Sequence, residues 1–339
     1  MAVLLGFLWA LLISVFAIPS ITYVAHVKKL LDKPGKRTLH ESLTPRLGGL
    51  AIFAGFMSAL TIFGDLSNGV QQVLAGCIVI FFIGLKDDLV TVAAFKKFFV
   101  QVLAAGIVMF MADIRITNFY GILGIYELEI GISYAFTFFV IIGITNSFNL
   151  LDGLDGLAGI IALIVCVAFS IYFYMYGDSV YAGVAFCLAG GVLGFLRYNL
   201  YKAIVFMGDS GSLICGFIIS VLAIKFITMN AVPSSPAIAV AILIIPIFDT
   251  LRVFILRILS GKSPFTPDKN HIHHRMLAYG CPQLFTVMIL ALLNLIIIAT
   301  TIYLSKIGNN RLLIFLVSIT LLLGIIIEII GKFKKIKIT

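Results

Sequence analysis

Charged residues are scarce in this chain. Asp, Glu, Lys and Arg make up 12% of its 339 residues, against about a quarter in soluble domains. Hydrophobic residues reach 61%, and the mean hydropathy is +1.16. This balance excludes a soluble globular protein. Apolar stretches of about 20 residues, the length that crosses a bilayer as a helix, recur almost from end to end. The sequence therefore predicts an all-α polytopic membrane protein.

Cysteine is also rare, with five residues and no C-x-x-C or other metal-type spacing. Cys77, Cys166, Cys187 and Cys215 lie inside apolar runs, and we interpret them as small buried hydrophobic side chains. The first apolar run lacks a basic start and an A-x-A cleavage site, so we expect it to be retained as a membrane span.

About eleven helical spans are predicted from the apolar stretches. They cover residues 2–25, 47–64, 69–85, 97–112, 132–146, 157–176, 180–196, 212–229, 236–259, 284–304 and 311–331. Pro246 predicts a kink or a break in the ninth, because proline removes a helical hydrogen bond. Residues 114–130 alternate and contain glycines, which predicts a small external β-hairpin. No internal repeat or linker is evident, so we expect one membrane domain over residues 1–339.

Basic residues fix the predicted orientation. With the N-terminus periplasmic or extracellular and the C-terminus cytoplasmic, roughly 20 of the 24 Lys and Arg residues lie inside, as the positive-inside rule requires. Arg115, Lys306 and Arg311 lie outside, and Lys225 lies within a span. We therefore expect a multi-pass protein of the cytoplasmic (inner) membrane, with its basic tail on anionic membrane lipids.

Acidic residues collect on the same inner side and at the ends of spans. Ion-coupled transporters instead place ionisable groups near the midplane, so this placement favours chemistry at the cytoplasmic face. The inner loops that we expect to build the site are 26–46, 86–97, 146–156, 197–212 and 249–283.

The loop at 146–156 is the most informative. Asn146, Asn149, Asp152 and Asp155 follow at intervals of three, and a glycine follows each acid. Hard oxygen ligands on a chain that can bend suit Mg²⁺ and a phosphorylated substrate.

The other inner loops leave alternatives open. Asp87 and Asp88 form either a site or a solvated helix end. In GDSGS, either Asp209 or a serine caps the next helix, or the helix start binds an anion and its metal. The first loop is either a basic turn or a phosphate contact through Lys33, Lys36, Arg37 and His40.

A histidine-rich segment follows the ninth span. No HExxH motif, cysteine partner or acid at ligand spacing accompanies it, which argues against zinc. If Asp268 caps a short helix there, His271, His274 and Arg275 share one face, which suits a diphosphate.

Together these motifs resemble the polyprenyl-phosphate N-acetylhexosamine-1-phosphate transferases (glycosyltransferase family 4), and within them the WecA/TagO branch. The motifs that carry the resemblance are Asp32-x-Pro…His40…Pro45…Gly-Gly, GLKDD, NxxNxxDGxDGL, GDSGS, Asp249-Thr250…Arg257 and HIHH. The MraY branch has ten spans and a triple-His run, so the His-Ile-His-His motif and the eleventh span favour WecA/TagO.

The resemblance implies a reaction. A polyprenyl phosphate such as undecaprenyl phosphate attacks the β-phosphorus of a UDP-N-acetylhexosamine, UDP-GlcNAc being expected, and UMP leaves. UDP-GalNAc and UDP-MurNAc-pentapeptide are the alternative donors. The implied cofactor is Mg²⁺, with Mn²⁺ as the alternative, held by Asp209 and Asn149. A homodimer is a candidate assembly, and no nucleic-acid partner is expected.

The resemblance also implies roles for the site residues, with one of Asp87 and Asp88 as a candidate base. The implied catalytic residues are Asp87, Asp88, Asp152, Asp155 and His271. The implied substrate-binding residues are Lys33, Arg37, His40, Asn146, Asn149, Asp249, Arg257, His273, His274 and Arg275. Such a site fits phosphoryl transfer, which needs alignment and charge neutralisation more than covalent machinery.

Three other functions remain alternatives. A transporter of nucleotide sugars or lipid-linked sugars would place acids at the midplane, yet only Lys225, Asp249 and Glu328 are clearly embedded in predicted spans. A CDP-alcohol-type phosphotransferase would carry an Arg in the acidic motif, which is absent after Asp152. A purely structural membrane protein would not need the polar inner face.

Overall fold

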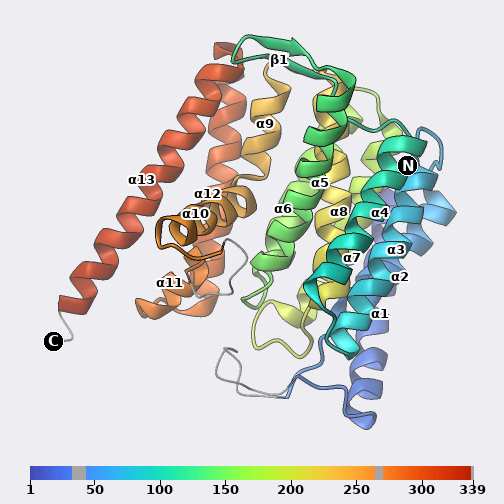
Figure 1. Ribbon diagram of the computed structural model, residues 1–339. Helices are drawn as coiled ribbons and strands as arrows, with labels where there is room; N and C mark the ends of the chain where they lie inside the picture. The colour runs from blue at the N-terminus through green and yellow to red at the C-terminus, as the bar shows by residue number, and fades with distance from the viewer. Residues whose placement is uncertain (33–42, 264–269, 337–339) are drawn as a thin grey trace. The chain divides into compact units, whose positions relative to one another are not determined.

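The computed structural model describes residues 1–32, 43–263 and 270–336, with side chains described as far as residue 329. The fold is almost entirely helical (Figure 1). Its contacts divide the chain into two compact units. The first comprises Met1–Asn118 and Glu127–Ala231, and the second comprises Phe119–Tyr126 and Val232–Thr339. The single domain expected over residues 1–339 stays a prediction.

The first unit is a bundle built around α8. Its helices are α1 Ala2–Val27, α2 Gly48–Phe63, α3 Val70–Leu89, α4 Ala94–Met111, α5 Ile130–Leu151, α6 Leu157–Met175, α7 Ser179–Asn199 and α8 Gly208–Met229. The α8 helix contacts α2, α3, α5, α6 and α7, and with α7 it is the most deeply buried span. A helix that is apolar on every side is expected at such a central position.

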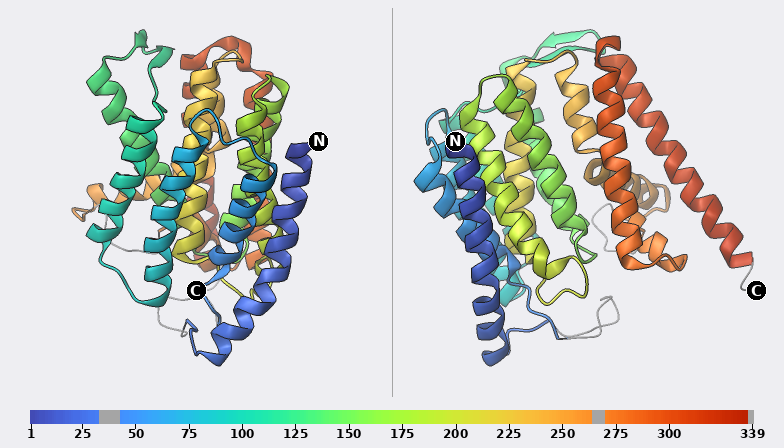
Figure 2. Two further views of the ribbon diagram at one scale, coloured as in Figure 1. Left: turned by 90° about the vertical axis from the view of Figure 1, so that its right-hand side faces the viewer. Right: turned by 180° about the vertical axis from the view of Figure 1, so that it is seen from behind.

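Small residues bring the helices of this unit close together. The α1 and α7 helices run side by side (Figure 2), and a Cβ placed on Gly190 would lie only 2.2 Å from the Phe7 carbonyl oxygen. Likewise, a Cβ on Gly55 of α2 would lie 2.6 Å from the Ala10 carbonyl oxygen. Such contacts are typical of membrane helices, where close backbone packing replaces the hydrophobic effect.

The cysteines behave as the sequence predicted. The four that lie in apolar runs are free and buried, and Cys281 is free and partly exposed. Their interpretation as small hydrophobic side chains is confirmed.

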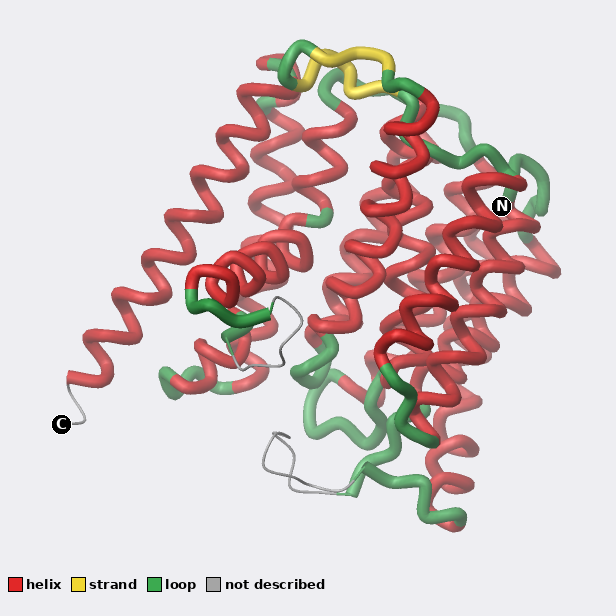
Figure 3. The backbone as a smooth tube through the Cα atoms, viewed as in Figure 1, coloured by secondary structure: helices red, strands yellow, loops and turns green. Residues whose placement is uncertain are grey.

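The second unit contains the hairpin and the C-terminal helices. Its elements are β1 Asn118–Ile122, β2 Ile125–Glu127, α9 Ser235–Ile242, α10 Ile244–Leu259, α11 Ile272–Ala278, α12 Gln283–Tyr303, the 3₁₀ helix η1 Ser305–Ile307 and α13 Asn309–Ile336. The strands pair as the hairpin that the sequence predicted (Figure 3).

The hairpin is fastened to the start of α13. Leu123 and Gly124 both adopt positive φ (51° and 79°), as in a type I′ turn. Asn310 Oδ1 accepts the Leu123 N–H at 2.9 Å, and Asn310 Nδ2 donates to the Gly121 carbonyl at 3.0 Å. Asn309 Nδ2 donates to the Tyr120 carbonyl at 3.1 Å.

The ninth predicted span is broken, which is one of the two outcomes that Pro246 predicted. The α9 and α10 helices meet at Leu243 and are bent by 77°. The break precedes Pro246 by three residues, because Pro246 lies in the first turn of α10. Proline is tolerated there, since an N–H in a first turn has no intrahelical partner.

The described helices that are long enough by themselves to span a membrane are fewer than the expected eleven. Among the described residues, nine helices are long and apolar enough to cross a membrane, or up to ten if the bent α9–α10 pair counts as one span. The α2 helix has 16 residues and falls short of that length. The polytopic architecture agrees with the sequence, while the count of eleven and the orientation stay predictions.

Candidate active site

The α8 helix begins against a carboxylate from α3. Asp88 Oδ1 accepts the Asp209 backbone N–H at 2.7 Å, and Asp88 Oδ2 accepts both the backbone N–H (3.0 Å) and the hydroxyl (2.6 Å) of Ser210. The N–H groups of a first helical turn have no carbonyl partner within the helix. Asp88 therefore holds the start of α8 in place and, with it, the side chain of Asp209.

Glycines permit this close approach. Gly208 has a φ of +73°, and a Cβ placed there would lie 2.6 Å from Asp88 Oδ1. A Cβ on Gly84, one helical turn before Asp88, would lie 2.6 Å from Ser210 Cα. The glycines of GLKDD and GDSGS are thus needed for the two motifs to meet.

Lys97 of α4 bridges two further carboxylates. Its Nζ lies 2.7 Å from Asp209 Oδ2 and 3.2 Å from Asp87 Oδ2. Asp87 Oδ1 also accepts the Val92 backbone N–H at 2.5 Å. These contacts place one cation between the last turn of α3 and the first turn of α8.

Asp152, which follows the last residue of α5, belongs to the same acidic cluster. Burial raises the pKa of the Asp152 carboxyl well above its usual range, and the nearby charges of Asp209 and Asp88 raise this pKa further. The Gly208 backbone N–H opposes the rise. Like charges in a partly desolvated site disfavour ionisation in this way unless a cation neutralises them.

Asn146 and Asn149, expected in a loop over residues 146–156, lie instead in the last turns of α5, because this helix continues to Leu151, and they face different partners. Asn149 Nδ2 donates to Ser212 Oγ of α8 at 3.0 Å, which brings Asn149 to the acidic cluster. Asn146 instead forms an amide pair with Gln101 of α4, in which its Nδ2 donates to Gln101 Oε1 at 2.9 Å. Of the two, Asn149 has the better access to a ligand beside α8.

Asp155 lies at the α7–α8 connection. Its Oδ2 accepts the Ala203 backbone N–H at 3.3 Å. Beside it, Gly156 adopts a φ of +79° and donates its N–H to Asn199 Oδ1 at 2.8 Å. This geometry shows Asp155 fixing a loop, and its expected catalytic role stays a prediction.

The first inner loop is described only in part. Arg46 pairs with Asp32 at 2.7 Å, and the Asp32 N–H donates to the Thr44 carbonyl at 2.9 Å, which closes the base of the loop. The predicted phosphate contacts of this loop lie outside the described residues, as does Asp268. They are Lys33, Lys36, Arg37 and His40.

The acidic cluster, defined by Asp87, Asp88, Asp152 and Asp209, has a chemistry that fits Mg²⁺. In the described part of the chain, no group of three or more His, Cys, Asp or Glu side chains is arranged to hold a metal. Mg²⁺, however, retains several waters and needs only one or two protein carboxylates. Asp87 and Asp209 share the ammonium of Lys97, Asp88 and Asp152 lie in the same cluster, and the Asp209 side chain is 24% exposed, so a hydrated divalent cation has both an electrostatic reason to bind and access.

The second unit carries a separate cluster around Asp249 of α10. Asp249 Oδ2 lies 2.9 Å from His271 Nδ1, and Asp249 Oδ1 accepts the Ile272 backbone N–H at 2.9 Å. Arg252 reaches Asp249 Oδ1 at 3.4 Å and also donates to the Asn270 carbonyl. Asp249 thus positions His271 by engaging its Nδ1 atom. The Nε2 atom, on the opposite side of the ring, does not take part in this contact.

The helix in the histidine segment differs in detail from the expected one. The α11 helix begins at Ile272, and His271 takes the N-cap position. His271 therefore caps the helix that carries His274 and Arg275, and its carbonyl accepts the Arg275 N–H at 3.1 Å; the cap that the sequence suggested, Asp268, lies outside the described residues. The imidazoles still gather, with ring centroids 5.7 Å apart for His271 and His273 and 4.3 Å apart for His273 and His274.

His273 is the buried member of this group. Its side chain is 1% exposed, and neither ring nitrogen has a hydrogen-bond partner among the described residues. Burial, with a smaller contribution from the neighbouring His274, lowers the pKa of His273 to about 3. The ring is therefore neutral at physiological pH.

Two predicted substrate-binding arginines have protein contacts. Arg275 pairs with Glu328 of α13. Arg257 is buried, with its guanidinium carbon 5.8 Å from the centroid of the Phe254 ring.

Sequence reasoning missed three contacts in these clusters. Lys97, Ser210 and Arg252 were not singled out as site residues from the sequence. The i, i+3 spacing of Asp249 and Arg252 was the one local signal. Lys97 and Asp209 lie 112 positions apart, so no local pattern could have joined them.

Comparisons with known proteins show which proteins this chain resembles. The family model for glycosyl transferase family 4 matches residues 70–227, which include the helices that carry the acidic cluster. A Bacillus subtilis protein named "Probable undecaprenyl-phosphate N-acetylglucosaminyl 1-phosphate transferase" is 32% identical over 98% of this chain and 95% of its own length.

Two further relatives have related names. A Mycobacterium tuberculosis protein named "Decaprenyl-phosphate N-acetylglucosaminephosphotransferase" is 33% identical over 84% of this chain and 78% of its own length. A Yersinia pestis protein named "Undecaprenyl-phosphate alpha-N-acetylglucosaminyl 1-phosphate transferase" is 32% identical over 74% of this chain and 70% of its own length.

Proposed function

The chain belongs to glycosyl transferase family 4, and from this premise we propose that it transfers N-acetylglucosamine 1-phosphate from UDP-GlcNAc to a polyprenyl phosphate such as undecaprenyl phosphate. The products are polyprenyl-diphosphoryl-GlcNAc and UMP. This reaction is a first membrane step of cell-surface polysaccharide synthesis. The names of the relatives support the acceptor and the transferred group.

The observation that carries the proposal is the acidic cluster at the start of α8. Asp88 fixes the first turn of that helix, and Lys97 holds Asp87 and Asp209 on either side of one ammonium. Such a set of fixed charges and donors is what phosphoryl transfer requires, because the reaction depends on positioning and electrostatic stabilisation. No covalent enzyme intermediate is needed.

In the proposed reaction, a phosphate oxygen of the acceptor forms a bond to the β-phosphorus of the donor. The bond between that phosphorus and the bridging oxygen breaks, and UMP leaves with the electron pair. A phosphate monoester has a second pKa of about 6 and is largely ionised at pH 7. The Asp87 carboxylate, already engaged by Lys97 and the Val92 N–H, then serves to position Lys97 rather than to remove a proton.

Asp209 and Asn149 are the proposed ligands of Mg²⁺, with Mn²⁺ as the alternative ion. The ion would supply charge neutralisation on the diphosphate. Asn149 is held for this role by its hydrogen bond to Ser212 on α8. Lys97, next to Asp209, adds a second positive charge beside the ion.

The histidine segment of the second unit is the proposed contact for the diphosphate and the sugar. His271 is oriented by Asp249, whereas His273 is buried and neutral. His274, on the first turn of α11, is the more accessible ring. These contacts would bear on the choice of sugar, for which UDP-GalNAc and UDP-MurNAc-pentapeptide are the alternatives to UDP-GlcNAc.

The proposed location of the acidic cluster is the cytoplasmic face of the inner membrane. Asp87, Asp88 and Lys97 lie at the same end of the α3–α4 pair, and the distribution of basic residues assigns that end to the cytoplasm. UDP-sugars are cytoplasmic metabolites, so this orientation gives the donor direct access.

The test is a transfer assay with purified protein, radiolabelled UDP-GlcNAc, undecaprenyl phosphate and Mg²⁺. We expect lipid-linked GlcNAc and UMP in equal amounts. Asp209→Asn should abolish the product, while Asp65→Asn, a change of an exposed acid in the α2–α3 connection, should not. Absence of product with UDP-GlcNAc, UDP-GalNAc and UDP-MurNAc-pentapeptide would overturn the proposal. A sugar transporter would then be the leading alternative.

A further inference from the structure

The first unit has a second polar feature, at the end of its helices opposite the acidic cluster. A hollow of about 540 Å³ lies where α3 begins and α4 ends, and it also borders the last turns of α8. Gln72 lines it from the first turn of α3. Asp88 lies 16 residues further along the same helix, which at about 1.5 Å per residue separates the hollow from the cluster by about 24 Å.

Lys225 supplies the positive charge of this hollow. It interrupts the apolar sequence of α8, and its ammonium lies 4.6 Å from the centroid of the Tyr181 ring. Among the described residues, no carboxylate forms an ion pair with Lys225. A lysine in a membrane span is costly, so a lysine without an acidic partner at such a place indicates a functional role.

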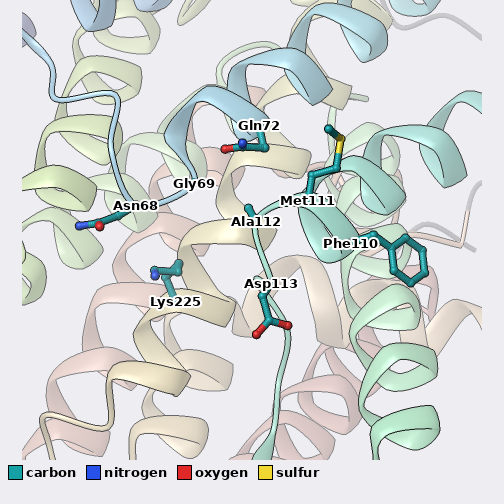
Figure 4. A pocket seen from close by; sticks show the side chains of 8 residues that line it. All are labelled: Asn68, Gly69, Gln72, Phe110, Met111, Ala112, Asp113 and Lys225. Atoms are coloured by element: carbon teal, nitrogen blue, oxygen red, sulfur yellow. The ribbon is translucent and has the colours of Figure 1, made fainter.

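Tyr181 also contacts the turn at Asn68, which forms part of the lining of the hollow next to Lys225. The Tyr181 hydroxyl donates to the Asn68 carbonyl at 2.8 Å, which fixes the turn before α3. Asn68 adopts a φ of +53°. Figure 4 shows Asn68 and Lys225 on one side of the hollow, with Gln72 nearby. Gln72 and Lys225 can therefore donate hydrogen bonds to a ligand in the hollow, whereas the Asn68 amide points away from Gln72.

The one acid of the hollow is already paired. Arg115 Nε lies 2.6 Å from Asp113 Oδ1, and Arg115 also donates to Ser133 Oγ at 3.1 Å. With Asp113 neutralised by Arg115, Lys225 leaves the hollow with an excess positive charge. The hollow is therefore suited to an anion.

The rest of the lining indicates an amphiphilic anion. Phe110 and Met111 form the other side of the hollow (Figure 4), and both side chains are 69% exposed. They belong to α4, which like α3 and α8 is long and apolar enough to span a bilayer. The phosphates of bilayer lipids lie at the ends of such spans, and basic pockets between membrane helices bind lipid headgroups.

We propose that the hollow binds the phosphate of a phospholipid headgroup, with Lys225 and Gln72 as donors and with the acyl chains lying along Phe110 and Met111. Free phosphate offers the same chemistry without the acyl chains. The two exposed apolar side chains beside the donors favour the lipid.

Native mass spectrometry of the full chain tests this proposal. The purified protein is titrated with phosphatidylglycerol or with diacylglycerol that has the same acyl chains and no phosphate. We expect retention of phosphatidylglycerol and not of diacylglycerol. Lys225→Gln should raise the Kd of the first bound phosphatidylglycerol about fivefold, which corresponds to the 1 kcal/mol or so that a lysine contributes near a lipid surface.

Two further variants complete the design. Lys306→Gln removes an exposed lysine in the 3₁₀ helix η1, and it should leave the Kd unchanged. Gln72→Ala changes one amide at the rim, so it should weaken binding even if Lys225→Gln fails to fold. Unchanged binding in both hollow variants, or equal retention of diacylglycerol, would overturn the proposal. If inorganic phosphate displaces the lipid, the hollow binds free phosphate, and the proposal that its ligand is a phospholipid is wrong.

Discussion

The carboxylate of Asp88 and the first turn of α8 at Ser210 form one hydrogen-bonded unit, in which a single Asp88 oxygen accepts both the backbone N–H and the hydroxyl of Ser210. The other oxygen accepts the N–H of Asp209. Asp88 therefore acts on the site by holding Asp209 rather than by facing a substrate with a free oxygen.

Asp88→Asn is expected to lower both stability and activity. The amide would present a donor where the carboxylate accepts, so at least one first-turn N–H of α8 loses its partner. Loss of a buried charge-assisted hydrogen bond costs about 2 kcal/mol. Thermal unfolding in detergent measures the stability, and the transfer assay measures the activity. Asp209→Asn, which leaves these bonds to Asp88 intact, should lose activity at unchanged stability. An Asp88→Asn protein that is inactive but as stable as the parent would assign Asp88 a direct chemical role.

Lys97 is expected to compete with a divalent cation for Asp209. Its ammonium lies 2.7 Å from Asp209 Oδ2, so a metal that binds this carboxylate must weaken the ion pair. Lys97→Gln should therefore increase the affinity for Mn²⁺, followed by electron paramagnetic resonance without substrate, by about fivefold, while transfer falls. Lys96→Gln, at the exposed neighbouring position, is the matched control. Weaker Mn²⁺ binding in Lys97→Gln would show that Lys97 supports the metal site instead.

The sequence was informative where a pattern is local. Residues 114–130 predicted the hairpin, because alternation and positive-φ glycines belong to one short segment. The carboxylates at span ends likewise identified Asp209 and Asp152 as site candidates. These features depend on residues that are close in the chain, so they can be predicted without knowing how the helices pack.

The partners within the site could not be predicted. Asp88 and Ser210 are 122 positions apart, and their contact depends on how closely α3 approaches α8 at Gly84. Packing decides such contacts. The position of the break before α10 could not be predicted either. Pro246 indicated that the helix is distorted nearby, but proline is tolerated in the first turn of a helix, and the break lies three residues earlier, at Leu243.

Asp249 is expected to be needed for the order of the histidine segment. It is 3% exposed, and its two oxygens engage His271 Nδ1 and the Ile272 N–H. Asp249→Ala leaves these buried donors without a partner and should cost about 3 kcal/mol of unfolding free energy. Asp249→Asn retains an acceptor for one of them and should cost less. Hydrogen exchange of the α11 amides measures the local effect, and unchanged protection in Asp249→Ala would contradict the positioning role.

His273 is expected to make the protein less stable in acid. Its pKa is about 3 in the folded chain, lowered chiefly by burial, against 6.5 as the ordinary value. Between these values the unfolded chain binds the proton and the folded chain does not, so stability falls as the pH falls through this window. From pH 7.5 to 5 the expected loss is about 2 kcal/mol, since one pKa unit corresponds to about 1.4 kcal/mol. His273→Leu removes the titrating group while filling the same apolar space, so the difference in Tm between these pH values should shrink. His274→Leu, at the more accessible ring, is the control that should keep the acid sensitivity of the parent. An equal fall in Tm for His273→Leu and the parent would show that other groups carry the acid response.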